Sequence, residues 1–159
     1  VIEVMGRNSG YLALMSAMAG GAEMVLIPEV DVDLDTVATE LRDAYVRGKT
    51  HAIVVVAEGA KHRSTDVVRF LQEKRGAAGF EARLTILGHV QRGGSPSAFD
   101  RILATRFGAA AVEELQKGTS GKMIGVRGTD LVVVDLLTAV TEKRPLDLQL
   151  YELHGILAR

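Results

Sequence analysis

Short apolar runs rich in β-branched residues alternate along the chain with longer stretches in which apolar positions recur every three or four residues. This alternation is typical of an α/β fold, in which helices cover a mostly parallel sheet. Most of the short runs are apolar at consecutive positions, as expected of strands that are buried on both faces. The pattern predicts six strands, at residues 1–4, 24–27, 53–57, 84–87, 123–126 and 131–134.

The longer stretches predict four helices, at residues 10–19, 34–47, 65–74 and 98–117. The first is apolar almost all round, which indicates a buried helix. In the second, Val37, Leu41 and Tyr45 recur every four residues and form one apolar stripe. The last segment, residues 144–159, has mixed apolar spacing, so we expect either a docking tail or a short terminal helix.

Composition narrows the class of protein. The chain has 159 residues, of which 47% are hydrophobic and 25% charged, as in one globular domain or one lobe of a larger protein. It has no cysteine, which excludes disulfides, thiolate nucleophiles and zinc sites built on cysteine. Nineteen basic residues oppose twenty acidic ones, so no global positive field favours nucleic acid or anionic lipid. Any anion site must therefore be local.

No segment is suited to a membrane or to export. The longest nearly uncharged run, residues 11–22, falls well short of the roughly 20 residues that a membrane span requires. No basic-then-apolar signal peptide opens the chain, so we expect a cytoplasmic protein. Because Val1 is not an initiator methionine and residues 1–4 already form a predicted strand, we also expect the downstream part of a longer chain.

Three predicted strands end in polar residues or glycine, at the edge of an open parallel sheet where ligands bind. Arg7 follows the first strand, beside the start of a helix whose free N–H groups favour anions. Glu58 follows the third strand and is suited to accept hydrogen bonds from hydroxyl groups. After the fourth strand, glycines allow close backbone approach while His89 and Arg92 offer charged donors to a phosphate. The alternatives are a capped helix with a solvated arginine, a solvated carboxylate and an ordinary glycine-rich turn.

A second polar cluster lies at the opposite, amino ends of the predicted strands. Gly21, Ala22 and Glu23 precede the second strand, and R-G-K-T-H at residues 47–51 precedes the third. Two cations around a glycine suit a phosphate, and Glu23 is able to hold Mg²⁺; the alternative is a helix end whose dipole the cations complement. Arg83 lies at this end too, so it cannot reach the Arg7 pocket within one subunit. His62 and His154 have no partner pattern and are predicted to be surface residues.

Several of these segments together resemble bacterial 6-phosphofructokinase, over nearly the whole chain and in order. The resemblance rests on M-G-R at residues 5–7, G-G-A-E at 20–23, E-G at 58–59 and G-H-V-Q-R-G-G-S-P at 88–96. It corresponds to the carboxyl-terminal half of that enzyme and implies a partial three-layer, Rossmann-like fold. Residues 1–92 would form the fructose 6-phosphate-binding lobe, truncated at its start. Residues 93–159 would return to a nucleotide-binding lobe that this chain lacks.

The resemblance also implies a substrate site. Arg7 would be catalytic, stabilising the transferring phosphoryl group, and would contact fructose 6-phosphate together with Met5 and Gly6. Glu58 would bind the sugar hydroxyls. His89 and Arg92 would hold the 6-phosphate within a substrate-binding segment that includes Val90 and Gln91, and Arg83 would join them from a neighbouring subunit.

The polar cluster at the amino ends would be the family's allosteric site. It would bind ADP or GDP as activator and phosphoenolpyruvate as inhibitor, with Glu23 as a ligand of effector-bound Mg²⁺. Subunit-shared sites imply a homo-oligomer, as in the family's tetramer. The residues concerned are Gly21, Ala22, Glu23, Arg47, Lys49, Thr50 and His51.

The implied reaction of the full-length protein is phosphoryl transfer from ATP, with Mg²⁺, to the 1-hydroxyl of fructose 6-phosphate, which yields fructose 1,6-bisphosphate in glycolysis. The family's nucleotide loop and its general base belong to the missing half, so we expect the isolated chain to be inactive. Two alternatives stay open: a pyrophosphate-dependent phosphofructokinase, and a non-catalytic module that binds sugar phosphates. Arg47 and Lys49 favour the ATP-dependent, allosterically regulated kind.

Overall fold

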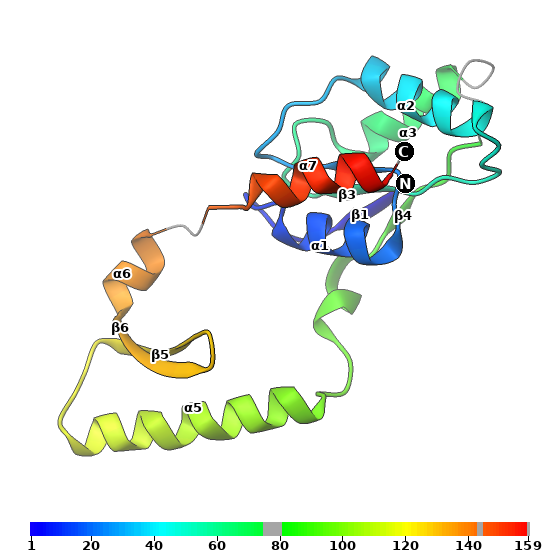
Figure 1. Ribbon diagram of the computed structural model, residues 1–159. Coiled ribbons are helices and arrows are strands. Elements are labelled where there is room, and N and C mark those ends of the chain that lie inside the picture. Colours follow the sequence, from blue (N-terminus) through cyan, green and yellow to red (C-terminus); the bar gives the residue numbers. More distant parts are fainter. Residues whose placement is uncertain (75–80, 143–144, 159) are drawn as a thin grey trace. The chain divides into compact units, whose positions relative to one another are not determined.

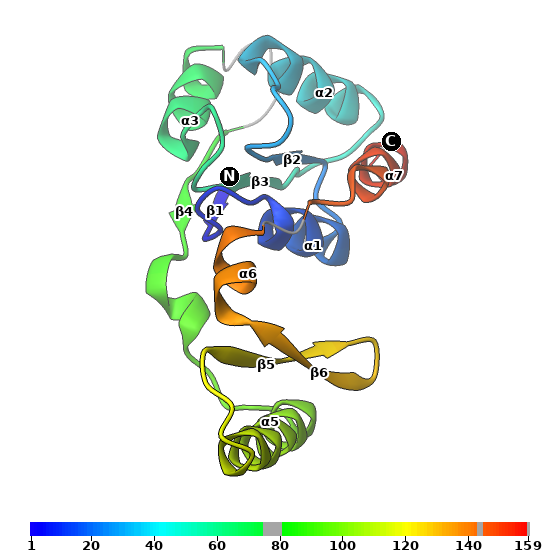
Figure 2. The same ribbon diagram turned by 90° about the vertical axis from the view of Figure 1, so that its left-hand side faces the viewer.

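A computed structural model describes residues 1–74, 81–142 and 145–158 of the chain (Figures 1 and 2). The described residues form two compact units. The first unit comprises Val1–Gly93 and Leu146–Arg159, and the second comprises Gly94–Pro145. The terminal segment therefore belongs with the first unit, whereas the sequence placed it in one segment with residues 93–145.

The first unit is built on a four-stranded parallel sheet with the strand order β2-β3-β1-β4. The predicted parallel α/β class is thus confirmed. In the central pair of strands, Val4 lies opposite Ala57, so these two strands end at the same level. The strands are β1 (Ile2–Val4), β2 (Met24–Leu26), β3 (Val54–Ala57) and β4 (Thr85–Ile86).

Helices cover both faces of this sheet, which makes three layers (Figure 2). Val25, Val55 and Ala57 face α1 in one apolar cluster, and the alternate positions Val54 and Val56 pack with α2 and α3 in another. Burial on both faces explains why the strands are apolar at consecutive positions. The helices are α1 (Tyr11–Gly20), α2 (Leu34–Val46), α3 (Ser64–Glu73), the 3₁₀ helix η1 (Gly88–Arg92) and α7 (Leu148–Leu157).

Local chemistry sets the ends of these helices. Asp33 caps α2 by accepting a hydrogen bond from the backbone N of Thr36 at 2.7 Å. Helix α1 ends at Gly21, whose φ of 63° is left-handed and suits glycine. Before α1, both carboxylate oxygens of Glu29 accept from the backbone N of Gly10, at 2.9 and 3.0 Å. A protein carboxylate therefore already occupies part of the helix start that was predicted to favour anions.

The terminal segment forms α7, so the terminal-helix interpretation is the correct one; residues 144 and 159 lie outside the described residues. Its apolar side chains Leu150 and Tyr151 pack against the α1 cluster. The apolar spacing is mixed here because only part of the helix faces this core.

The second unit contains one long helix, a hairpin and a short helix. The capping box of Ser97 and Asp100 begins the long helix, and Gly128, at φ 64°, lies in the hairpin turn. The two predicted strands here pair antiparallel with each other, outside the parallel sheet, and the short helix was not predicted. The elements are α5 (Ala98–Gln116), β5 (Lys122–Arg127), β6 (Asp130–Asp135) and α6 (Leu136–Thr141).

Candidate functional site

Three loops at the carboxyl edge of the first unit's sheet enclose a pocket of about 570 Å³. The loops follow β1, β3 and β4, and the level ends of β1 and β3 bring the first two side by side. Nearly all the residues predicted for a substrate site line this pocket, together with Leu12 of α1, which the sequence analysis missed. The lining residues are Met5, Gly6, Arg7, Leu12, Glu58, His89, Gln91 and Arg92.

Arg7 has an unusual backbone. Its φ of 48° is left-handed, and no other non-glycine residue of the described chain has a positive φ. Such a conformation costs free energy for a residue with a Cβ, on the order of 1 kcal/mol or more. Contacts from the neighbouring loop must therefore hold it.

Glu58 supplies the first of these contacts. Its Oε1 accepts hydrogen bonds from the backbone N of Arg7 at 2.7 Å and from the backbone N of Gly6 at 3.3 Å. Gly59 supplies the second, because a Cβ at this position would lie 1.6 Å from the carbonyl oxygen of Arg7. Only glycine lets the two loops approach this closely.

Gln91 ties the third loop to the first. Its Oε1 accepts from the backbone N of Met5 at 3.2 Å, and its Nε2 donates to the carbonyl oxygen of Gly88 at 3.0 Å. The backbone N–H groups of Met5, Gly6 and Arg7 are thus all held by side chains of the other two loops. This arrangement fixes the relative positions of Arg7, Glu58 and η1 without any ligand.

The charges in the pocket suit a phosphate ester that also carries hydroxyl groups. The backbone N–H groups of Arg7 and Gly6 lower the pKa of Glu58, and the positive charges of Arg7 and Arg92 add to this effect. Glu58 is therefore ionised at neutral pH, and its Oε2 has no hydrogen-bond partner among the described residues. The carboxylate can accept from a hydroxyl, while Arg7, His89 and Arg92 can donate to an anion.

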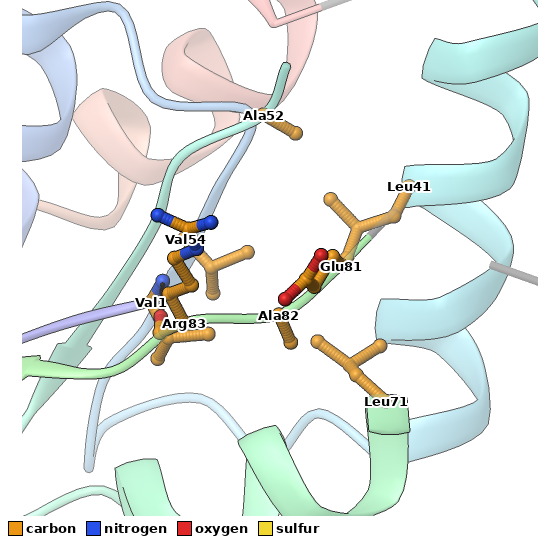
Figure 3. Close-up of a pocket in the computed structure, with 8 residues that line it drawn as sticks. All are labelled: Val1, Leu41, Ala52, Val54, Leu71, Glu81, Ala82 and Arg83. Carbon is orange, nitrogen blue, oxygen red and sulfur yellow. Dashed lines mark hydrogen bonds between the residues drawn. The ribbon is translucent and has the colours of Figure 1, made fainter. Parts of the chain in front are cut away.

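Two predicted substrate residues lie away from this pocket. Val90 is exposed and does not line it. Arg83 precedes β4 and lines a different pocket at the amino ends of the strands, which Figure 3 shows with Leu41, Leu71 and Glu81. Within one chain, Arg83 does not lie with Arg92.

The structure also groups most of the predicted allosteric residues. Lys49 Nζ donates to Glu23 Oε1 at 3.1 Å, and Glu23 Oε2 accepts from the backbone N of Ile53 at 2.5 Å. Glu23 and Arg47 line one hollow, and Gly21, Ala22 and Lys49 line another. Thr50 and His51 line neither: Thr50 Oγ1 lies 3.3 Å from His51 Nδ1.

Metal binding in this cluster would need a ligand that brings its own oxygens. Among the described residues, no three His, Cys, Asp or Glu side chains lie together in a way that could hold a metal ion. Glu23 supplies one carboxylate, which suits Mg²⁺ when phosphate oxygens complete its coordination.

His154 corrects one expectation. The sequence predicted a surface residue, but the side chain is only 5% exposed and Nε2 lies 2.9 Å from the carbonyl oxygen of Ala22. It reaches the cluster of Ala22, Glu23 and Lys49 because α7 belongs to the first unit, which no local pattern indicates. Separately, none of the helices in the described part of the chain combines the length and the apolar character needed to cross a membrane.

The fold and the pocket define an α/β protein with a pocket lined by Arg7, His89 and Arg92 at the carboxyl edge of a parallel sheet. A family model described as Phosphofructokinase matches residues 1–115. The chain belongs to the phosphofructokinase family, as the sequence motifs predicted.

Curated relatives carry the name ATP-dependent 6-phosphofructokinase. The protein of Bacillus cytotoxicus is 47% identical over 153 residues, which cover 96% of this chain and 47% of that protein. The protein of Natranaerobius thermophilus is 49% identical over 153 residues, again 96% of this chain and 47% of the relative. The chain thus spans about half the length of the curated relatives that it matches.

Solved structures agree on the fold. Phosphofructokinase from Saccharomyces cerevisiae superposes with a TM-score of 0.77 at 38% identity, over 87% of this chain and 20% of that one. Pyrophosphate-dependent phosphofructokinase from Marinobacter aquaeolei gives 0.74 at 24% identity, over 93% of this chain and 41% of that one. The second likeness supports the shared fold alone.

Proposed function

We propose that this chain is the fructose 6-phosphate-binding part of an ATP-dependent 6-phosphofructokinase, from the carboxyl-terminal half of that enzyme. One observation carries the proposal: the Met5–Arg7 loop, Glu58 and the His89–Arg92 turn line a single pocket. The names of the curated relatives favour ATP as donor over pyrophosphate.

Each side chain has a distinct role in this proposal. Arg92 and His89 bind the 6-phosphate by charge-assisted hydrogen bonds, and the free Oε2 of Glu58 accepts from a sugar hydroxyl. Arg7, whose loop is held by Glu58 and Gln91, stabilises charge on the phosphoryl group in transit. The 1-hydroxyl oxygen forms a bond to the γ-phosphorus as the bond to ADP breaks, and the hydroxyl proton leaves to a base outside this chain.

The other parts of the proposal concern the whole protein. Arg83 completes the phosphate site from a neighbouring subunit, which requires a homo-oligomer such as a tetramer. Glu23, Arg47 and Lys49 form the allosteric site, which takes ADP or GDP with Mg²⁺ and, in competition, phosphoenolpyruvate. Residues 1–92 form the fructose 6-phosphate lobe, residues after 92 lead to the nucleotide lobe, and the protein acts in the cytoplasm.

Calorimetric titration with fructose 6-phosphate tests the site. We expect Arg92→Ala to lose about 1.5 to 3 kcal/mol of binding free energy, a typical value for a hydrogen bond to a charged group. Arg69→Ala is the matched control, because Arg69 lies on α3 and pairs with Asp66 outside the pocket. Equal affinity in the Arg92→Ala variant would remove Arg92 from the site.

A coupled assay for ADP release tests whether this chain is half of an ATP-dependent enzyme, here called the half-enzyme proposal. The alternatives are a pyrophosphate-dependent enzyme and a non-catalytic module that binds sugar phosphates. The chain supplies the acceptor side only, so we expect no turnover with ATP, Mg²⁺ and fructose 6-phosphate. Turnover by the purified chain would contradict the half-enzyme proposal. Turnover of the longer protein with pyrophosphate and not with ATP would favour the pyrophosphate-dependent alternative.

A further inference from the structure

A buried histidine of the last helix contacts the loop that carries Glu23. His154 Nε2 lies 2.9 Å from the carbonyl oxygen of Ala22, and a carbonyl only accepts, so Nε2 carries the proton and donates it. The two residues are 132 positions apart in the sequence. Helix α7 is held nearby by apolar packing of Leu150 and Tyr151 on the α1 cluster.

This bond holds one peptide plane from one side, and Ile53, the residue before β3, holds it from the other. The carbonyl of Ala22 and the N–H of Glu23 belong to the same planar peptide unit. The carbonyl accepts from His154, while the N–H donates to the carbonyl oxygen of Ile53 at 2.9 Å. Rotating the plane would break both bonds, so together they set the direction in which the Glu23 side chain leaves the backbone.

Glu23 in turn orients a cation. Its Oε1 accepts from Lys49 Nζ at 3.1 Å, and Lys49 Nζ also donates to the carbonyl oxygen of Ala158, just beyond α7, at 3.2 Å. An ammonium group has three N–H donors, so one remains for an anion. The end of the chain therefore positions Lys49 in two ways. Ala158 accepts a hydrogen bond from Lys49 directly, and His154 acts indirectly by holding the Ala22–Glu23 peptide.

His154 also lines both hollows in which the cations of the cluster lie. It lines the hollow that contains Arg47 and Glu23, and it lines the hollow that contains Gly21 and Lys49. Arg47 has no side-chain hydrogen bond or ion pair with the described residues. We infer that His154 is a positioning residue, which holds the Gly21–Glu23 loop, and through it Lys49, in the geometry that an anion shared with Arg47 requires. The identity of that anion rests on the proposed allosteric site, but the positioning does not.

Hydrogen exchange of the whole chain tests the positioning without any ligand. We expect His154→Leu, which removes the donor, to speed exchange of the Glu23 amide several-fold, while His154→Gln restores protection because its amide nitrogen can donate at a similar reach. Ile156→Ala is the control on the same helix, because Ile156 is exposed and lines neither hollow. Unchanged β1 and β3 amides show that the fold is retained. Equal exchange of the Glu23 amide in wild type, His154→Leu and His154→Gln, or equally fast exchange in the two variants, would overturn the inference.

Calorimetric titration with ADP tests the consequence for binding. The loss of one neutral hydrogen bond should weaken ADP roughly 2- to 10-fold in His154→Leu and leave His154→Gln near the wild-type affinity. Wild-type or tighter affinity in His154→Leu would count against a positioning role in binding. If wild type and Arg47→Ala bind ADP equally or not at all, the proposed allosteric site fails, and the exchange experiment still decides the role of His154.

Discussion

At the scale of single residues, the pocket is shaped by side chains that form hydrogen bonds to backbone N–H groups of a neighbouring loop. Arg7 is left-handed because Glu58 accepts its N–H and that of Gly6, while Gly59 leaves room for its carbonyl. The sequence predicted that Arg7 and Glu58 would follow strands at the same edge of the sheet. It did not predict their bond, because nothing near either residue shows that a carboxylate 51 positions away would bind the Arg7 backbone.

Gly59→Ala should disrupt the pocket, although it adds only one methyl group. The new Cβ would lie 1.6 Å from the Arg7 carbonyl oxygen, so the Arg7 loop must move. We expect a loss of about 1 to 3 kcal/mol in the free energy of unfolding, as for other overpacked sites, and at least a tenfold loss of fructose 6-phosphate affinity. Urea unfolding followed by circular dichroism, and calorimetry, measure the two effects.

The same substitution at Gly108 is the matched control. A Cβ there meets nothing within 4 Å, and the position lies inside α5. Gly108→Ala should stabilise the helix by up to about 1 kcal/mol. If Gly59→Ala bound substrate as tightly as Gly108→Ala, the close approach of the two loops would have no role in the pocket.

The pKa of Glu58 should depend more on hydrogen bonds from backbone N–H groups than on the charges of nearby arginines. Hydrogen bonds from Arg7 N and Gly6 N are the largest causes of its lowered pKa, ahead of the Arg7 and Arg92 charges. In a carbon NMR titration, Arg7→Ala should therefore leave the pKa of Glu58 below the ordinary value of about 4.3, whereas Gly59→Ala should return it there. Because the folded pKa is lowered, the bonds stabilise the loop above the unfolded pKa and are lost as pH falls through the folded one. A full return to the ordinary pKa in Arg7→Ala would show that charge dominates.

At the scale of elements, helices and strands with strong local signals were predicted best. Helix α2 has an apolar stripe and an aspartate cap, and its structure spans Leu34–Val46 against a predicted 34–47. The turn η1 and helix α6 were missed because both are short, at 5 and 6 residues, and too brief to establish a helical period. Helix α7 was predicted only as one of two alternatives, since its partner is α1, far back in the chain.

The docking of α7 should weaken in mild acid. Burial lowers the pKa of His154, although the bond to the Ala22 carbonyl and the charge of Glu23 favour the protonated form. The two hollows that His154 lines contain further titratable side chains besides Glu23. These are Glu40, Arg47, Lys49 and Tyr151. Since the folded pKa is lowered, the stabilising contribution of neutral His154 is complete above the unfolded pKa of about 6.5 and is lost as pH falls through the folded value.

Urea unfolding at pH 7.5 and 5.5 measures this effect. Wild type should lose more unfolding free energy between the two conditions than His154→Gln, which has no group that titrates there at this position. The other three of the four histidines are common to both proteins, so the difference isolates His154. Equal losses in the two proteins would mean that protonation of His154 does not loosen α7.

At the scale of the whole molecule, the two units differ in how well they bury their apolar residues. The first unit has two apolar clusters around its sheet. In the second unit, no described residue is buried, and Phe99 of α5 and Leu137 of α6 are 71% and 72% exposed. The proposed function implies that a nucleotide-binding lobe of a longer protein would cover these side chains.

The isolated chain should therefore self-associate through the second unit. Exposed apolar patches favour association, so sedimentation of the wild type should shift to larger, open-ended species as concentration rises. The double variant Phe99→Ser with Leu137→Ser should reduce this shift. Val46→Ser is the control, because Val46 is 77% exposed but lies on α2 in the first unit. An equal shift in all three proteins would place the association elsewhere.

The sequence by itself determined the α/β class, most element positions, the polar strand ends and the family. These properties follow from local periodicity, from turn residues and from motifs of adjacent residues. Only the tertiary structure decided that Glu58 holds the Arg7 backbone, that α7 returns to the first unit and that His154 is buried against Ala22. Each of these is a contact between groups far apart in the chain, and its free energy depends on a distance that no local pattern records.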